Sequence, residues 1–117
     1  MTRPLAAALR RLVQTRIPSV PFLEALLLLQ QRSPQRLAAA DVARQLYLDD
    51  HEAVTLLDQI SAAGLCRADG DGLARNWRFD RDDPELGPLV DELARCYATQ
   101  LVELTKLIHA GKVPPAP

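Results

Sequence analysis

Two short apolar patterns of helical spacing, joined by only four residues, most constrain the fold of this 117-residue chain. In the first pattern, Val42 and Leu46 lie one helical turn apart. The second pattern has the same period and consists of Ala53, Val54, Leu57 and Ile60. Because residues 47–50 leave so little chain between them, the two helices must cross steeply to pack these stripes together.

A β-hairpin is predicted directly after the second helix. Gly64 is suited to the left-handed conformation that ends a helix, and residues 65–67 then continue as a strand. Two Asp-Gly pairs at 69–72 predict a tight turn, after which residues 73–79 return as the second strand. A short extended piece at 35–37 is expected to add a third strand to this sheet.

Two crossed helices followed by a hairpin resemble the winged helix-turn-helix transcription regulators of bacteria, including the MarR group. The resemblance covers roughly residues 20–80 and is carried by Ala39, Ala40, Asp41, Val42, Ala43, Arg44, Gln45, Leu46, Ala53, Val54, Leu57, Ile60, Gly64 and Leu65. It implies that the second helix of the pair enters the major groove of DNA and that the hairpin is the wing. The chain departs from the pattern at Ala38, where a Ser or Thr cap is expected, at a cost of about 1 kcal/mol.

The predicted fold class is mainly α with a small antiparallel β-wing. Hydrophobic residues make up 48% of the chain and aromatic residues only 4%, so Leu and Ala must fill most of the core, which favours helices. The two aromatic residues of the wing, Trp77 and Phe79, are expected to anchor it to the core. The predicted segments are an N-terminal basic amphipathic helix (1–16), the winged domain (19–80), a long C-terminal helix (84–110) and a disordered tail (111–117).

The last helix predicts a homodimer. It begins at Pro84 or Pro88, two possibilities that the sequence leaves open, and reaches roughly 35 to 40 Å at 1.5 Å per residue. Since that exceeds what a domain of this size needs, its apolar face is expected to pair with a second copy across a two-fold axis. The predicted interface residues are Leu93, Tyr97, Leu101, Leu104 and Ile108.

The N-terminal segment is basic, because residues 1–16 hold four arginines and no acid. Three interpretations are open for it: a solvated helix on the body of the protein, an arm that crosses to a second subunit, or a basic surface for phosphate or anionic lipid. In the phosphate interpretation, Arg10 and Arg11 contact DNA.

The charge on the second helix departs from that of DNA-reading helices. Its outward stripe offers Thr55 and Gln59 as base or phosphate contacts, but Asp49, Asp50 and Glu52 stand near them and would repel the backbone. The hairpin is better supplied with cations, although neighbouring aspartates, among them Asp69, Asp71 and Asp80, bring its net charge close to zero. The full set of predicted DNA contacts is Arg10, Arg11, Arg67, Arg75, Arg78, Thr55 and Gln59.

No catalytic, cofactor or metal site is predicted. The two histidines, His51 and His109, have no spacing to Cys, Asp or Glu that resembles a triad or a zinc site. Two cysteines are too few for a disulfide framework, although a bridge between Cys66 and Cys96 stays open. The chain shows no signal peptide and no apolar run long enough to span a bilayer, so a cytoplasmic location without membrane contact is expected.

Two hypotheses for function follow. The first is a non-enzymatic, homodimeric, transcription-associated factor that binds DNA through the wing arginines and the basic first helix. The second is a winged-helix protein-interaction module that binds another protein through the acidic helix at 51–63 and does not touch DNA.

Overall fold

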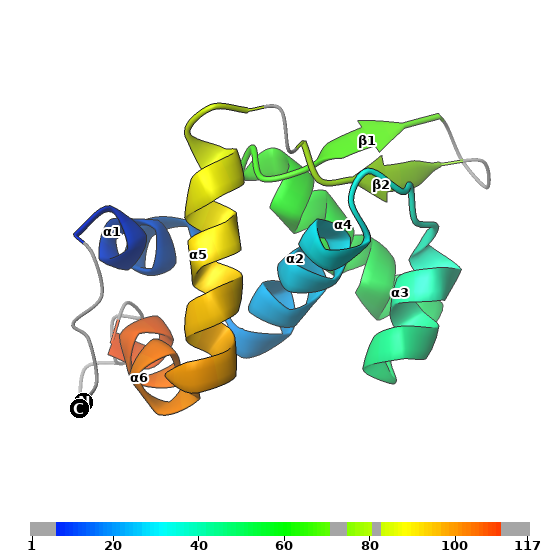
Figure 1. Ribbon diagram of the computed structural model, residues 1–117. Helices are drawn as coiled ribbons and strands as arrows, with labels where there is room; N and C mark the ends of the chain where they lie inside the picture. The colour runs from blue at the N-terminus through cyan, green and yellow to red at the C-terminus, as the bar shows by residue number, and fades with distance from the viewer. Residues whose placement is uncertain (1–6, 71–74, 81–82, 111–117) are drawn as a thin grey trace.

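The computed structural model describes residues 7–70, 75–80 and 83–110 (Figure 1). Within these ranges the chain is mainly helical with one small antiparallel sheet, as the composition predicts. The elements in chain order are α1 (Ala7–Arg16), α2 (Val20–Arg32), α3 (Ala39–Leu46), α4 (Asp50–Ala62), β1 (Arg67–Asp69), β2 (Asn76–Arg78), α5 (Leu86–Thr99) and α6 (Leu101–Ala110). The predicted tail at 111–117, the second Asp-Gly pair at 71–72 and the first six residues of the predicted N-terminal helix lie outside the described residues.

Helix α2 is the central element, because it packs against α3, α4 and α5. It begins with a cap: Ser19 Oγ accepts a hydrogen bond from the Phe22 N–H at 3.3 Å, and Pro21 lies in the first turn, where it removes no helical hydrogen bond. Its buried residues are Phe22, Leu23, Ala25, Leu26 and Leu29.

Helices α3 and α4 pack against each other across the predicted short turn. Tyr47 takes a left-handed φ of 58° and ends α3. Asp49 Oδ1 then accepts a hydrogen bond from the Glu52 N–H at 2.7 Å and begins α4. The apolar spacing is confirmed, because the facing stripes are buried at Val42, Ala43, Ala53, Leu57 and Ile60.

The start of α3 lacks a side-chain cap, as the sequence predicts, but it is partly compensated. Ala38 offers no side-chain acceptor to the first turn. Asp41 Oδ2, however, accepts a hydrogen bond from the Ala38 N–H at 3.1 Å, which is the reverse half of a capping box. The predicted cost of about 1 kcal/mol for the missing cap is therefore an upper value.

The hairpin forms, but its first strand lies two residues later than predicted and its second strand is shorter than predicted. Its register pairs Arg67 with Arg78, Ala68 with Trp77 and Asp69 with Asn76. Gly64 has a φ of 78°, which confirms the left-handed end of the preceding helical segment. The strand starts at Arg67 and not at Leu65, because Leu65 and Cys66 turn into the core before pairing begins.

The predicted third strand at 35–37 is reduced to a single bridge. The Leu37 N–H donates to the Trp77 carbonyl at 2.8 Å, and the Trp77 N–H donates to the Leu37 carbonyl at 2.9 Å. Two hydrogen bonds are enough to hold the loop after α2 beside β2. Trp77 and Phe79 are buried, so their predicted role as anchors of the hairpin is confirmed.

The single long helix predicted over 84–110 is wrong. The chain forms α5 and α6 instead, separated at Gln100, whose φ of −133° and ψ of 41° are not helical. Helix α6 folds across the end of α5 and packs against α1 (Figure 1). The physical reason is burial: a straight continuation would carry Leu104 and Ile108 past the body of the protein, whereas the break buries both of them.

Helix α5 begins between the two predicted starting points. Asp83 Oδ1 accepts hydrogen bonds from the N–H groups of Glu85 and Leu86, both at 2.9 Å, so this carboxylate acts as the cap.

No single helix in the described ranges is long and apolar enough to cross a membrane. Helices α1 and α2 reach that length and composition only when they are taken together, and the chain bends by 118° between them.

Candidate nucleic-acid interface

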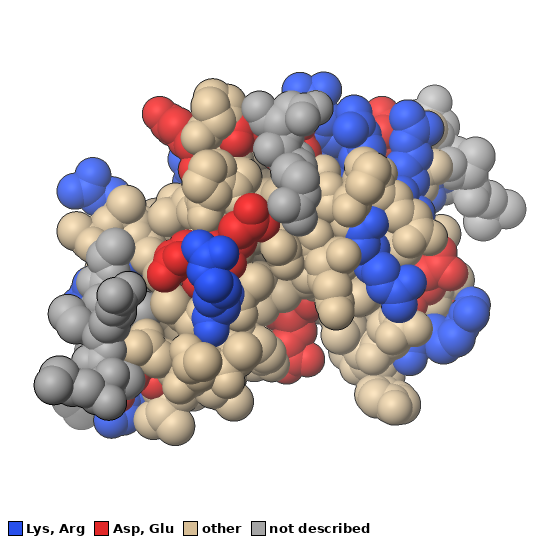
Figure 2. All heavy atoms as spheres, viewed as in Figure 1, with Lys and Arg blue, Asp and Glu red and all other residues tan. Residues whose placement is uncertain are grey.

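The arginines of the hairpin gather on one edge of the molecule. Arg67 and Arg78 face each other across the strand pair, and the Leu37–Trp77 bridge places Arg36 beside them. Figure 2 shows Lys and Arg atoms gathered at the upper right, over the hairpin of Figure 1. We call Arg36, Arg67 and Arg78 the hairpin arginines.

Aspartates partly neutralise these arginines. Asp69 Oδ2 lies 3.7 Å from Arg36 Nε and 3.6 Å from Arg78 Nε, so two guanidinium groups share one carboxylate. Arg67 Nε lies 2.9 Å from Asp80 Oδ2. Pairs this exposed contribute little to stability, and a phosphate can compete with the carboxylates at small cost. The cluster of three arginines and two aspartates keeps one surplus positive charge.

Arg75, also predicted to contact DNA, serves a different purpose. Its Nη2 lies 3.1 Å from Asp58 Oδ1 of α4, and its guanidinium carbon lies 5.2 Å from the centre of the Trp77 ring. The two contacts join the hairpin to α4 and cover the indole. Arg75 is thus held by the fold, and we do not count it among the cations available to phosphate.

Helix α4 presents an acidic end to solvent. Asp49, Asp50 and Glu52 are exposed at its first turn. The Glu52 N–H bond lowers the pKa of Asp49 below its ordinary value, so this cap remains charged. The positive end of the helix dipole, which could otherwise attract phosphate, is therefore covered by carboxylates.

The two polar residues predicted to read DNA from α4 are both exposed, but their surroundings differ. The Thr55 hydroxyl donates to the His51 carbonyl at 3.0 Å, so it is turned back onto its own helix. Gln59 lines a cleft of about 700 Å³ in which it faces Thr15 and Arg16 at the end of α1. Neither side chain lies among the hairpin arginines.

The basic first helix is separated from the hairpin. Arg10 and Arg11 are exposed on α1, which packs against α5 and α6. Figure 1 places α1 on the other side of α5 from the hairpin. The structure therefore does not bring all the predicted DNA contacts onto one surface: Arg67 and Arg78 lie together, and Arg10 and Arg11 lie apart from them.

Three of the five predicted dimer residues lie in the core of the single chain. Leu93, Leu104 and Ile108 are buried inside one chain, because α6 folds back onto the body. They cannot contact a second copy without unfolding that packing. The other two, Tyr97 and Leu101, remain half-buried and exposed, respectively.

Arg36 is the cation that the sequence analysis missed. The signal was present, since residues 35–37 were predicted to pair with the wing and Arg36 is part of that segment. What the sequence did not specify was the register, which places Arg36 against the same aspartate as Arg78.

The titratable side chains outside this surface do not assemble a metal or disulfide site. In residues 7–70, 75–80 and 83–110, no group of three His, Cys, Asp or Glu side chains could hold a metal ion. Cys66 and Cys96 are free thiols, so the bridge left open by the sequence is not formed. His51 and His109 are both exposed.

Comparisons with protein-family models, with curated proteins and with solved structures found no match.

Proposed function

We propose that this chain is a non-enzymatic winged helix-turn-helix protein of the bacterial regulator type, which associates with DNA by contacting phosphates through its hairpin arginines. Two arguments support the fold assignment. The elements follow one another as a buried helix, two closely joined helices and a hairpin. The sequence of residues 20–80 also resembles that of winged-helix regulators. A cytoplasmic location is part of the same proposal.

The observation that carries the DNA proposal is the sharing of Asp69 by Arg36 and Arg78. One carboxylate cannot neutralise two guanidinium groups, so the cluster attracts an anion that can bridge them. Phosphate suits a pair of arginines because its oxygens accept several charge-assisted hydrogen bonds. Such contacts position a protein on the duplex but carry no direct sequence information.

The acidic end of α4 favours DNA binding through phosphate contacts of the hairpin and disfavours base contacts by α4. A helix that enters the major groove passes between two phosphate backbones, and Asp50 and Glu52 would be repelled by both. We therefore propose that binding depends little on base sequence and strongly on salt.

A mobility shift with mixed genomic DNA fragments at about 50 and 200 mM salt tests this proposal. Retardation should be present at the lower salt and fade at the higher salt. The double change Arg36→Gln and Arg78→Gln should weaken binding to all fragments alike and reduce the slope of log K against log salt by about two.

The double change Arg10→Gln and Arg11→Gln is the matched control, since it removes the same charge from the other side of α5. It should leave most of the binding intact. Equal loss from both pairs would show that total charge, and not the hairpin, governs binding. Absence of retardation at the lower salt would refute the DNA proposal.

The acidic end of α4 favours a second candidate, a module that binds a basic segment of another protein. Asp50 and Glu52 are exposed and available, whereas Asp58 already pairs with Arg75. The changes Asp50→Arg and Glu52→Arg should then abolish capture of that partner without loss of fold. Unchanged capture would count against this candidate.

A further inference from the structure

A small polar pocket of about 200 Å³ lies between the end of α2, the loop that follows it and α3. The hairpin arginines are not among the residues that line it. Figure 2 shows Lys and Arg atoms in this region as well, below the hairpin and between the end of α2 and α3 in Figure 1. The lining residues that carry the inference are Arg32, Gln35, Leu37, Asp41, Arg44 and Gln45.

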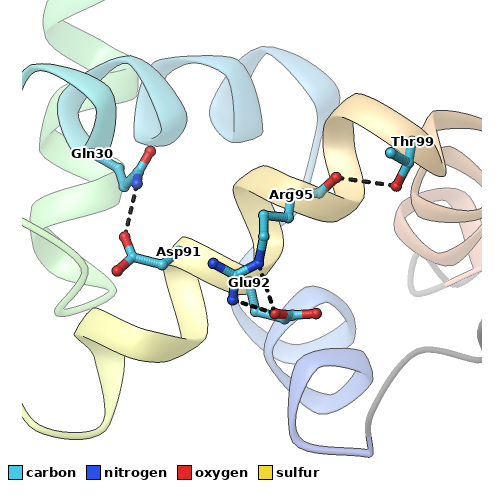
Figure 3. A network of polar contacts seen from close by, with 5 residues as sticks. All are labelled: Gln30, Asp91, Glu92, Arg95 and Thr99. Carbon is cyan, nitrogen blue, oxygen red and sulfur yellow. Dashed lines mark hydrogen bonds and ion pairs between the residues drawn. The ribbon is translucent and has the colours of Figure 1, made fainter.

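Two arginines and one aspartate give the pocket a surplus positive charge. Arg32 has no carboxylate partner within the described residues, in contrast to Arg95, whose Nε donates to Glu92 Oε2 at 3.1 Å (Figure 3). Arg44 Nη2 lies 3.9 Å from Asp41 Oδ1, and a stronger anion can displace so long and exposed a pair at small cost. The other oxygen, Asp41 Oδ2, accepts a backbone N–H bond at the start of α3 at 3.1 Å. The two guanidinium groups are therefore only weakly neutralised.

Amide side chains add hydrogen-bond donors to the two arginines. Gln35 lines the pocket from the loop and Gln45 from α3, so donors converge from three segments of the chain. A carboxylate offers two oxygens to such donors, whereas a phosphate monoester offers three, and arginine binds phosphate oxygens in pairs. Sites for drug-sized molecules occupy roughly 300–1,000 Å³. The smaller volume of this pocket therefore favours a small oxyanion.

The loop wall of the pocket is fixed at both ends. The Gln35 N–H donates to the Arg32 carbonyl at 2.8 Å and closes the turn after α2. The Leu37–Trp77 bridge holds the other end beside β2. Successive residues of an extended segment point to opposite sides, so Gln35 and Leu37 line the pocket while Arg36 reaches the hairpin. A preformed wall lowers the entropic cost of binding a ligand.

We propose that this pocket binds a small phosphate dianion, as inorganic phosphate or as the phosphate group of a small phosphomonoester, between Arg32 and Arg44. The amides of Gln35 and Gln45 complete the set of donors around it. Two charge-assisted hydrogen bonds of ordinary strength correspond to a dissociation constant on the order of 1 mM. This site does not depend on DNA binding, because neither arginine belongs to the hairpin arginines.

Titration of the 117-residue chain with inorganic phosphate at pH 7.5 and constant ionic strength, followed by the backbone amide signals in NMR, tests the pocket. The signals of Gln35, Leu37 and Gln45 should shift and saturate. Acetate should bind at least about tenfold more weakly, because it offers fewer oxygens and less charge. Absence of saturable shifts with phosphate, or equally tight binding of acetate, would overturn the proposal.

Methyl phosphate distinguishes the two sources of the phosphate group. If it binds about as tightly as inorganic phosphate, the pocket has room for the ester of a small molecule, and the phosphomonoester is the ligand class. If inorganic phosphate alone saturates these signals, the ligand is the free ion.

Charge removal tests the role of the two arginines. Arg32→Gln together with Arg44→Gln should weaken phosphate binding by at least about tenfold, because two charge-assisted contacts are lost. Arg10→Gln together with Arg11→Gln is the matched control, since it removes the same charge from exposed positions of α1. The control should change the affinity by less than about twofold, because salt screens charges outside the pocket. Equal loss from both pairs would show that only total charge attracts the anion.

A gain of affinity tests the same site without the risk of a damaged fold. Asp41→Asn keeps an oxygen that can accept the Ala38 N–H but removes the carboxylate that competes with phosphate for Arg44. Phosphate should then bind about threefold more tightly. Unchanged or weaker binding would place the anion outside this pocket.

Mobility shift of the arginine variants separates this proposal from the DNA proposal. Saturable phosphate binding by a protein that does not retard DNA would reject the DNA proposal alone. Retardation that depends on Arg32 and Arg44, in a protein without saturable phosphate binding, would show that these arginines contact the DNA backbone and would overturn the phosphate pocket.

Discussion

At the scale of single residues, Cys66 shows how the core controls chemistry. Burial raises the pKa of its thiol to about 12, and the negative charge of Asp58 acts in the same direction. The thiol is therefore almost entirely protonated near neutral pH, and the thiolate is the reactive form. We expect iodoacetamide at pH 8 to label Cys66 far more slowly in the native protein than in urea. Peptide mass spectrometry measures this, and rapid native labelling would contradict the burial of this side chain.

Asp83 links a single carboxylate to the pH dependence of stability. Hydrogen bonds from the N–H groups of Leu86 and Glu85 lower its pKa below the ordinary 3.8. A group with a lowered pKa in the folded state stabilises that state above its unfolded pKa, and the stabilisation is lost as pH falls through the lower folded value. We therefore expect a loss of stability below pH 3.8 that depends on this residue.

The matched variants for Asp83 are Asn and Ala. Asp83→Asn keeps an oxygen acceptor for the two N–H groups but has no charge to titrate, so the acid-side slope of the unfolding free energy should become smaller. Asp83→Ala removes the cap as well and should be less stable than Asp83→Asn at pH 7. Urea unfolding at pH 3 and pH 7 measures both effects. If the unfolding free energy of Asp83→Asn falls as much between pH 7 and pH 3 as that of the unchanged protein, Asp83 is not a source of the acid-side loss of stability.

At the scale of elements, α3 has a correctable defect at its start. Ala38 has φ of −82° and ψ of 160°, which suits a capping Ser. Ala38→Ser should supply the missing acceptor and raise the free energy of unfolding by about 1 kcal/mol. Ala40→Ser, at an exposed position inside the helix, is the control and should not stabilise. No gain in the midpoint of thermal unfolding would contradict this prediction, because Asp41 bonds only the Ala38 N–H and supplies no acceptor to the first turn of the helix.

At the scale of the whole molecule, α6 closes the core by packing on α1. The first and last described helices are thus joined, and Leu104 is fully buried between elements from both ends of the chain. Leu104→Ala should lower the free energy of unfolding by about 3 kcal/mol through loss of burial and formation of a cavity. The exposed neighbour Glu103→Ala should change it by less than about 0.5 kcal/mol. Equal effects in urea unfolding would show that α6 is not part of the core.

Much of the fold could be predicted from the sequence because it depends on local signals. Helical spacing identified α3 and α4, and Gly64 marked the left-handed turn before the hairpin. Each signal acts within a few residues. Trp77 and Phe79 were correctly placed in the core because their size and apolar character leave few alternatives.

The end of the chain and the surface charges were decided by tertiary structure alone. Residues 84–110 have an uninterrupted helical period, and no Pro or Gly marks Gln100 as a break. Helix α6 turns there because α1 offers an apolar surface that a straight helix would leave exposed. Likewise, the sequence determined that arginines and aspartates alternate near the hairpin. Only the strand register decided that Arg36 and Arg78 share Asp69, since ion pairing depends on distances between side chains far apart in the chain.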